Sequence, residues 1–84
     1  MKFPKDTELY RIIGSNIKYH REQAKMTQVQ LADAAQISIS YLSKIEAIRC
    51  DKSLSISVLN QIANVLDIDI TIFFKEVPQN DKYC

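Results

Sequence analysis

The chain has 84 residues, of which 46% are hydrophobic and 25% are charged. This length allows one small domain, and the composition is that of an ordered globular protein rather than a disordered chain. One glycine and two prolines are too few for the many turns of a sandwich or barrel, so short helices joined by tight connections are favoured. The net charge of +1 gives no argument for binding nucleic acid.

The sequence gives little support for a signal peptide, a membrane span, a metal site or a catalytic site. The opening MKFPKDTE has no apolar stretch of signal-peptide length, and the longest uncharged run, residues 53–66, is too polar for a membrane span. Cys50 and Cys84 lack a Cys-x-x-Cys spacing, which favours reduced thiols in a cytoplasmic protein; an intermolecular disulfide through Cys84 is the alternative. With one histidine (His20), no nucleophile–base spacing and no glycine-rich phosphate loop, we expect no metal, no cofactor and no enzyme.

The first predicted helix covers residues 7–25. Leu9, Ile13 and Ile17 recur at intervals of four, which is the spacing of one helix face. Asp6 or Thr7 can cap its first turn.

The second predicted helix, residues 28–35, has the clearest start signal. Thr27 is followed three residues later by Gln30, the pattern of a capping box in which each side chain bonds the other residue's backbone N–H. Met26 before the cap and Leu31 after it form the matching hydrophobic staple.

A third helix, residues 39–47, is predicted after Ser38, which can cap it. Its apolar positions are Leu42 and Ile45, so Ser40 and Lys44 fall on the opposite face. Two short helices about three residues apart make a candidate helix-turn-helix.

Ser55 is expected to cap a fourth helix that runs to Leu66. The run that follows is ambiguous, because residues 68–74 alternate like a strand while Asp69 can cap a one-turn helix over residues 70–74. We expect residues 1–6 to form an arm, 7–74 the helix-turn-helix domain and 75–84 a polar tail.

Three sequence pieces, in order, carry a resemblance to a known family. They are Gln28-Val29-Gln30-Leu31-Ala32, Ser43-Lys44-Ile45-Glu46 and Leu59-Asn60-Gln61-Ile62-Ala63-Asn64-Val65-Leu66. The stretch from residue 14 to 74 resembles the Cro/cI-type (XRE-type) helix-turn-helix DNA-binding regulators, with similarity to restriction-modification controller proteins and to sporulation/biofilm-type repressors. The resemblance implies an all-α fold of five short helices, the third of which lies in the DNA major groove.

The resemblance also implies roles for individual residues. Arg21 and Glu46 match a buried ion pair, and Gln28 matches a residue that contacts the phosphate backbone. Three positions where the family usually has glycine hold other residues here: Gln36 in the turn, Ala47 after the third helix and Asp67 after the fourth. A left-handed residue at Gln36 costs on the order of 1 kcal/mol more than glycine.

The charges are unevenly distributed. Residues 1–49 hold eight basic and five acidic residues, a net +3, whereas residues 50–84 have a net −2, so the basic half carries the helix-turn-helix. We predict base contacts from Ile39, Ser40 and Lys44, although Ile39 is also suited to packing against the second helix. The residues predicted to contact phosphate are Gln28, Ser38, Tyr41, Ser43, Arg49 and Lys52; partial core packing is the alternative for Tyr41, and a plain exposed serine for Ser43.

The end of the chain has more apolar residues than one small core needs. Such a surface usually marks an interface, and the residues are Ile70, Ile72, Phe73, Phe74 and Val77. We therefore predict a homodimeric transcriptional regulator, a repressor or autoregulator, that reads a near-palindromic double-stranded DNA operator with no small-molecule ligand. The alternative is a protein-interaction module, such as an antitoxin or anti-regulator, that uses the same fold.

Overall fold

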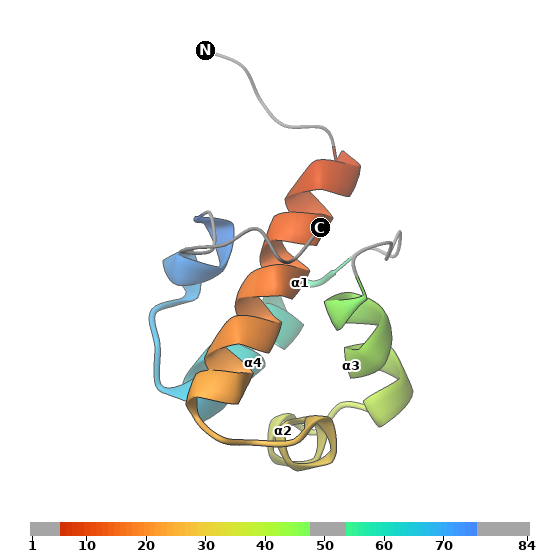
Figure 1. Cartoon of the computed structure of the whole chain (residues 1–84), viewed down its shortest axis with the longest axis vertical. Helices are drawn as coiled ribbons and strands as arrows, with labels where there is room; N and C mark the ends of the chain where they lie inside the picture. Colours follow the sequence, from red (N-terminus) through yellow and green to blue (C-terminus); the bar gives the residue numbers. More distant parts are fainter. Residues whose placement is uncertain (1–5, 48–53, 76–84) are drawn as a thin grey trace.

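A computed structural model describes residues 6–47 and 54–75, and these are helical with no strand among them. Four α-helices are followed by one 3₁₀ helix (Figure 1): α1 (Asp6–Gln23), α2 (Gln28–Ala35), α3 (Ile39–Glu46), α4 (Ile56–Leu66) and η1 (Ile70–Phe74). The predicted all-α class is therefore confirmed. The predicted count of five helices is corrected to four α-helices, because the last element is a single 3₁₀ turn.

Helix α1 lies at the centre of the domain, and α3, α4 and η1 pack against it (Figure 1). Ile13 and Ile17, two of the residues from the predicted apolar face, are buried. They share one core with residues from every other element: Leu31, Ala32, Ala35, Leu42, Ile45, Leu59, Ile62, Ala63, Leu66 and Phe73.

The helix starts follow the local signals in the sequence. The Thr27 hydroxyl accepts the N–H of Gln30 at 3.0 Å and the Gln30 side chain accepts the N–H of Thr27 at 2.8 Å, which confirms the capping box. Ser38 and Ser55 cap α3 and α4 through the N–H groups of Tyr41 and Val58. Because each bond spans three residues, a serine or threonine before an apolar periodic segment locates these helix starts.

Three helices end in the same way, each without glycine. Lys25, Gln36 and Asp67 are left-handed, with φ of 61°, 61° and 58°. At each end, the residue after the left-handed one donates its N–H five residues back: Met26 to Arg21, Ile37 to Ala32 and Ile68 to Ala63. Because these three apolar residues also pack against the core, tertiary packing stabilises the left-handed turns.

The left-handed Lys25 ends α1 two residues before the predicted boundary. Helix α3 ends one residue early as well, since Ala47 is extended, with φ −71° and ψ 130°. Ala47 therefore occupies a conformation that needs no glycine.

Replacing Gln36 with glycine is expected to stabilise the domain by about 0.5–1 kcal/mol. The relief of left-handed strain exceeds the extra backbone entropy that glycine loses on folding. The cap itself survives, because it is made by the backbone N–H of residue 36. Thermal unfolding checks this result, with Gln36→Ala as the matched control, and an equal gain from alanine would show that the Gln36 side chain, not its backbone, limits stability.

Residues 70–74 form the one-turn helix, so the alternative of a strand is wrong. The Asp69 carboxylate accepts the backbone N–H of Thr71 at 2.9 Å and its hydroxyl at 2.8 Å. These bonds lower the pKa of Asp69, because they favour the charged carboxylate.

Asn16 of α1 holds η1 in place by hydrogen bonds. Its side chain is buried, and the two hydrogens of its Nδ2 are shared among three carbonyls: that of Ile12 at 3.1 Å, that of Phe73 at 3.0 Å and that of Lys75. One side-chain amide thus forms hydrogen bonds with carbonyls that lie 57 and 59 residues further along the chain. The sequence does not reveal this role, because a lone asparagine within a helical pattern carries no local sign of a distant partner.

Candidate nucleic-acid interface

Helices α2 and α3, with the turn between them, form the predicted helix-turn-helix (Figure 1). Leu42 and Ile45 bury the inner face of α3, so that Ser40, Ser43 and Lys44 are exposed on its other side. Gln61 of α4 donates to the carbonyl of Ala35 at 3.1 Å and so fixes the end of α2. The outer face of α3 therefore lies on a helix whose inner face is anchored in the core.

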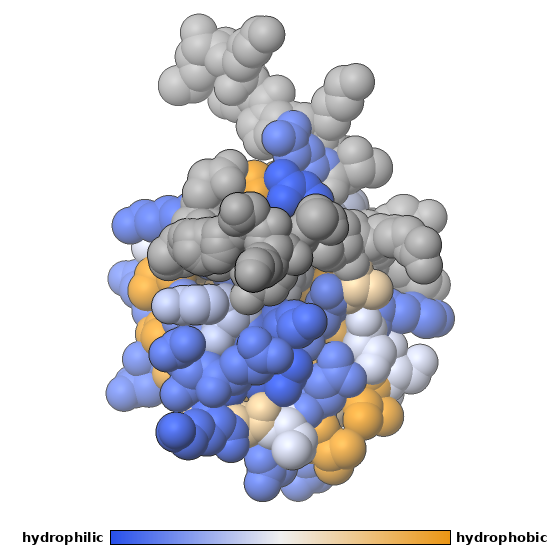
Figure 2. Space-filling view, in the orientation of Figure 1, coloured by the Kyte–Doolittle hydropathy of each residue, from blue (hydrophilic) through white to orange (hydrophobic). Residues whose placement is uncertain are grey.

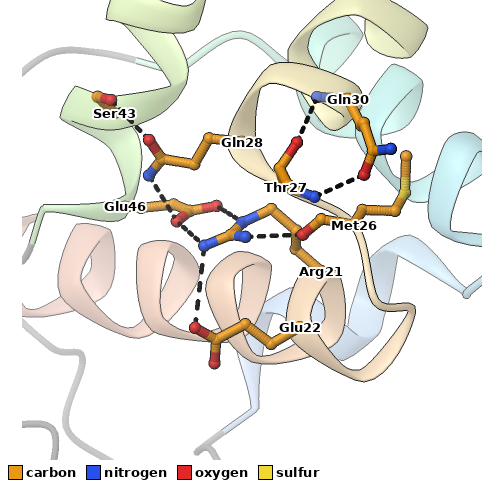
Figure 3. A network of polar contacts seen from close by, with 8 residues as sticks. All are labelled: Arg21, Glu22, Met26, Thr27, Gln28, Gln30, Ser43 and Glu46. Atoms are coloured by element: carbon orange, nitrogen blue, oxygen red, sulfur yellow. Dashed lines mark hydrogen bonds and ion pairs between the residues drawn. The ribbon is translucent and has the colours of Figure 1, made fainter.

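A buried ion pair joins α1 to the end of α3 (Figure 3). Arg21 Nε donates to Glu46 Oε2 at 2.8 Å and its Nη2 to Oε1 at 3.0 Å, and these side chains are 10% and 3% exposed. Nη1 donates to the carbonyl of Met26 at 2.8 Å. The hydrogen bond to Glu46 raises the pKa of Arg21. The pairing that the resemblance implied is thus present in the geometry.

Gln28 extends this network to the exposed face of α3 (Figure 3). Its Nε2 donates to Glu46 Oε1 at 3.0 Å, and its Oε1 accepts the Ser43 hydroxyl at 2.9 Å. Two residues predicted to contact phosphate are therefore bonded to each other. The sequence did not reveal this bond, since the two residues lie 15 positions apart.

The other predicted DNA-contacting residues divide by exposure. Ser40 and Lys44 are exposed and Ile39 is 44% exposed, whereas Tyr41 is half-buried against the core. The Ser38 hydroxyl accepts the N–H of Tyr41 as the α3 cap. Arg49 and Lys52 lie outside the described residues, as do Cys50 and Cys84.

Apolar surface borders this polar face. Figure 2 shows it at the lower right, over α2 and the start of α3. The large exposed apolar residues on these two helices are Val29, 61% exposed, and Ile39. The predicted alternative for Ile39, packing against α2, stays a prediction beside the base contact.

One residue of the predicted dimer interface is corrected. Phe73 is 0% exposed in the core of a single chain, so it cannot contact a second copy without unfolding. Its neighbour Phe74 is 43% exposed, and Ile70 and Ile72 are half-buried. Neighbouring positions of a 3₁₀ helix point to different sides, so Phe73 and Phe74 differ in burial, which the apolar run does not disclose. Val77 lies outside the described residues.

Residues 6–47 and 54–75 contain neither a helix suited to a membrane nor a cluster of metal-binding side chains. No helix in these ranges has the length and apolar character needed to cross a bilayer. The same residues contain no group of three or more His, Cys, Asp or Glu placed to hold a metal ion.

A helix-turn-helix with a polar outer face on a small helical core defines a class of DNA-binding module. The helix-turn-helix family model matches residues 17–73, and the chain belongs to this XRE-type family. A curated relative, the immunity repressor protein of Bacillus phage phi105, is 42% identical over 64 residues, which are 76% of this chain and 43% of that protein. The chain thus spans less than half of that relative's length.

Solved structures share the fold. SinR, a master regulator for biofilm formation crystallised with DNA, is 32% identical, with a TM-score of 0.70 over 75% of this chain and 98% of its own. The clp gene regulator ClgR from C. glutamicum is 25% identical, with a TM-score of 0.70 over 84% and 86% of the two chains. A hypothetical transcription factor from Neisseria, NHTF, is 18% identical with a TM-score of 0.75 over 90% and 85%, a likeness of fold alone.

Proposed function

We propose that this chain is a sequence-specific DNA-binding transcription regulator, a repressor or autoregulator that acts by binding and not by catalysis. The observation that carries the proposal is the outer face of α3, where Ser40 and Lys44 are exposed while Leu42 and Ile45 anchor the helix. A relative named as a repressor and a neighbour crystallised with DNA support it.

Base reading is assigned to Ser40, Lys44 and Ile39. Lys44 follows Ser40 by four residues, so both side chains lie on one face and can enter the major groove together. An ammonium donates to guanine O6 and N7, and an exposed isoleucine is suited to the thymine methyl group.

Phosphate contacts are assigned to the start of each helix of the helix-turn-helix. Gln28, the first residue of α2, has a backbone N–H that no intrahelical carbonyl can reach, and its Nε2 has a second hydrogen beyond the one directed at Glu46. Ser38 and Tyr41 lie at the start of α3, where unpaired N–H groups favour an anion, and the Tyr41 hydroxyl is the group assigned to phosphate.

Two copies are proposed to bind a near-palindromic operator, in which half-sites lie about 34 Å apart. Phe74 is the exposed apolar residue of η1 that supports a contact between copies, with the half-buried Ile70 and Ile72 beside it. Sedimentation of the protein alone and with a selected duplex gives the number of copies bound.

Replacing Lys44 with alanine is expected to remove the preference for one base pair and to lower affinity for the best site about tenfold. One good contact from a basic side chain to guanine is worth about 1–3 kcal/mol of discrimination. The measurement is a binding titration on duplexes selected from a randomised library, followed by the same titration on single-base variants of the best duplex.

Lys75→Ala is the matched control for the loss of one positive charge. Lys75 is exposed and directly follows η1, which lies on the other side of α1 from α3 (Figure 1). Equal losses from the two variants on every duplex would contradict base reading by Lys44, because they would reflect charge alone. Wild-type protein that selects no sequence at low salt would overturn the proposed function.

A further inference from the structure

In the hydrogen-bond network behind α3, the donor and the acceptor of each bond can be assigned. Arg21 has only donors, so the Glu46 carboxylate accepts from it at 2.8 and 3.0 Å. Glu46 Oε1 also faces the amide of Gln28 at 3.0 Å. A carboxylate held in this way accepts hydrogen bonds, so the amide atom that faces it is the nitrogen.

That orientation decides what Gln28 offers to Ser43. With its nitrogen on Glu46, the amide directs its oxygen at the Ser43 hydroxyl, 2.9 Å away. An amide oxygen only accepts, so Ser43 must donate its single hydrogen to Gln28. The lone pairs of the Ser43 oxygen are then what this hydroxyl presents to any group outside the protein.

We infer that Ser43 meets DNA as a hydrogen-bond acceptor and selects a base that carries an amino group in the major groove, adenine or cytosine. The inference rests on the proposed function, in which α3 lies in that groove. Phosphate oxygens only accept, so a hydroxyl whose hydrogen is already used cannot donate to them. The donors at the floor of the major groove are adenine N6 and cytosine N4.

Ser43 is therefore a specificity-determining residue and not the phosphate contact that the sequence predicted. Gln28 acts as a positioning residue, since it fixes the direction of the Ser43 hydroxyl from a neighbouring helix. A serine free of such a partner accepts or donates and discriminates little among bases.

The test compares wild type with Ser43→Ala, using duplexes selected from a randomised library. We expect wild type to prefer adenine or cytosine at one position and Ser43→Ala to lose that preference, with about a fivefold loss on the best duplex, since one neutral hydrogen bond is worth about 1 kcal/mol. Ser57→Ala, an exposed serine on α4, is the matched control and should bind as wild type does.

The second part of the test changes the DNA base instead of the protein. If adenine is selected, a duplex with purine at that position lacks only the amino group; it should weaken wild type about fivefold and leave Ser43→Ala unchanged. Gln28→Met releases the Ser43 hydrogen, so this variant should tolerate guanine or thymine at the same position, whatever its overall affinity.

Three results would overturn the inference. They are an equal loss on all duplexes for Ser43→Ala, which marks a phosphate contact; no change at all; or an unaltered base preference in Gln28→Met. Each leaves sequence-selective binding by wild type intact, and so separates failure of this inference from failure of the proposed function. Circular dichroism and thermal unfolding of each variant show that it is folded.

Discussion

Replacing Gly14 with alanine is expected to destabilise the domain by about 2–3 kcal/mol, although alanine is the better helix former by about 1 kcal/mol. A Cβ atom at residue 14 would lie 2.2 Å from the carbonyl oxygen of Ile45 and 3.3 Å from its carbonyl carbon. Those atoms belong to the backbone of α3, so no rotation of a side chain relieves the contact. Either α1 or α3 must shift, which disturbs the buried face of α3.

Urea unfolding of Gly14→Ala measures this loss, and Gln23→Ala is the control for adding alanine to an exposed position of α1. The control should change stability by less than about 0.5 kcal/mol. At a temperature where Gly14→Ala remains folded, we also expect weaker selective DNA binding, because α3 carries the residues proposed to read bases. A variant as stable as wild type would show that α1 and α3 separate at little cost.

This fold needs glycine at one of two places where the family or the geometry favours it. The left-handed turn after α2 forms without glycine, whereas the contact between α1 and α3 requires it. The sequence places the only glycine, Gly14, inside the first predicted helix and Gln36 in the turn. The left-handed turn forms with glutamine because Ile37 is held by the core. The close approach of two backbones at Gly14 has no such substitute, since any side chain fills the space.

Local chemistry explains which parts of the fold were predictable. Caps such as Thr27, Ser38 and Ser55 bond within three residues, and apolar spacing at three and four locates the core face of each helix. The boundaries of α2 agree with the prediction for that reason.

Contacts between distant segments were not predictable from local pattern. Asn16 bonds carbonyls near residue 74, Gln28 bonds Ser43, and Phe73 rather than Phe74 enters the core. Each depends on how helices cross, which the order of residues along one helix does not specify. The ion pair of Arg21 and Glu46 was expected only through the family resemblance.

Replacing Glu46 with alanine is expected to cost about 3–5 kcal/mol of stability, a large share of what a domain of this size has. The guanidinium of Arg21, 10% exposed, would remain buried without its anion, and Gln28 Nε2 would lose its acceptor. Denaturant unfolding at neutral pH measures the loss.

The matched control removes both charges. Arg21→Met combined with Glu46→Leu keeps the volume and strands no buried charge, so it should recover most of the stability lost by Glu46→Ala. A double variant no more stable than Glu46→Ala would mean that the pair itself, and not the stranded charge, accounts for the effect.

In this double variant we expect stability to be largely recovered while base selection is not. Apolar packing can replace the ion pair as a support for α3, but leucine cannot accept the Gln28 amide hydrogen that Glu46 Oε1 accepts. Once that amide is free to turn, its nitrogen can face Ser43 and donate to it, and the hydroxyl recovers a hydrogen for other partners. We therefore expect a folded protein that binds DNA with relaxed selection at the Ser43 position, measured by the same library selection. Retained selection would show that the direction of the Ser43 hydroxyl is set without the buried carboxylate.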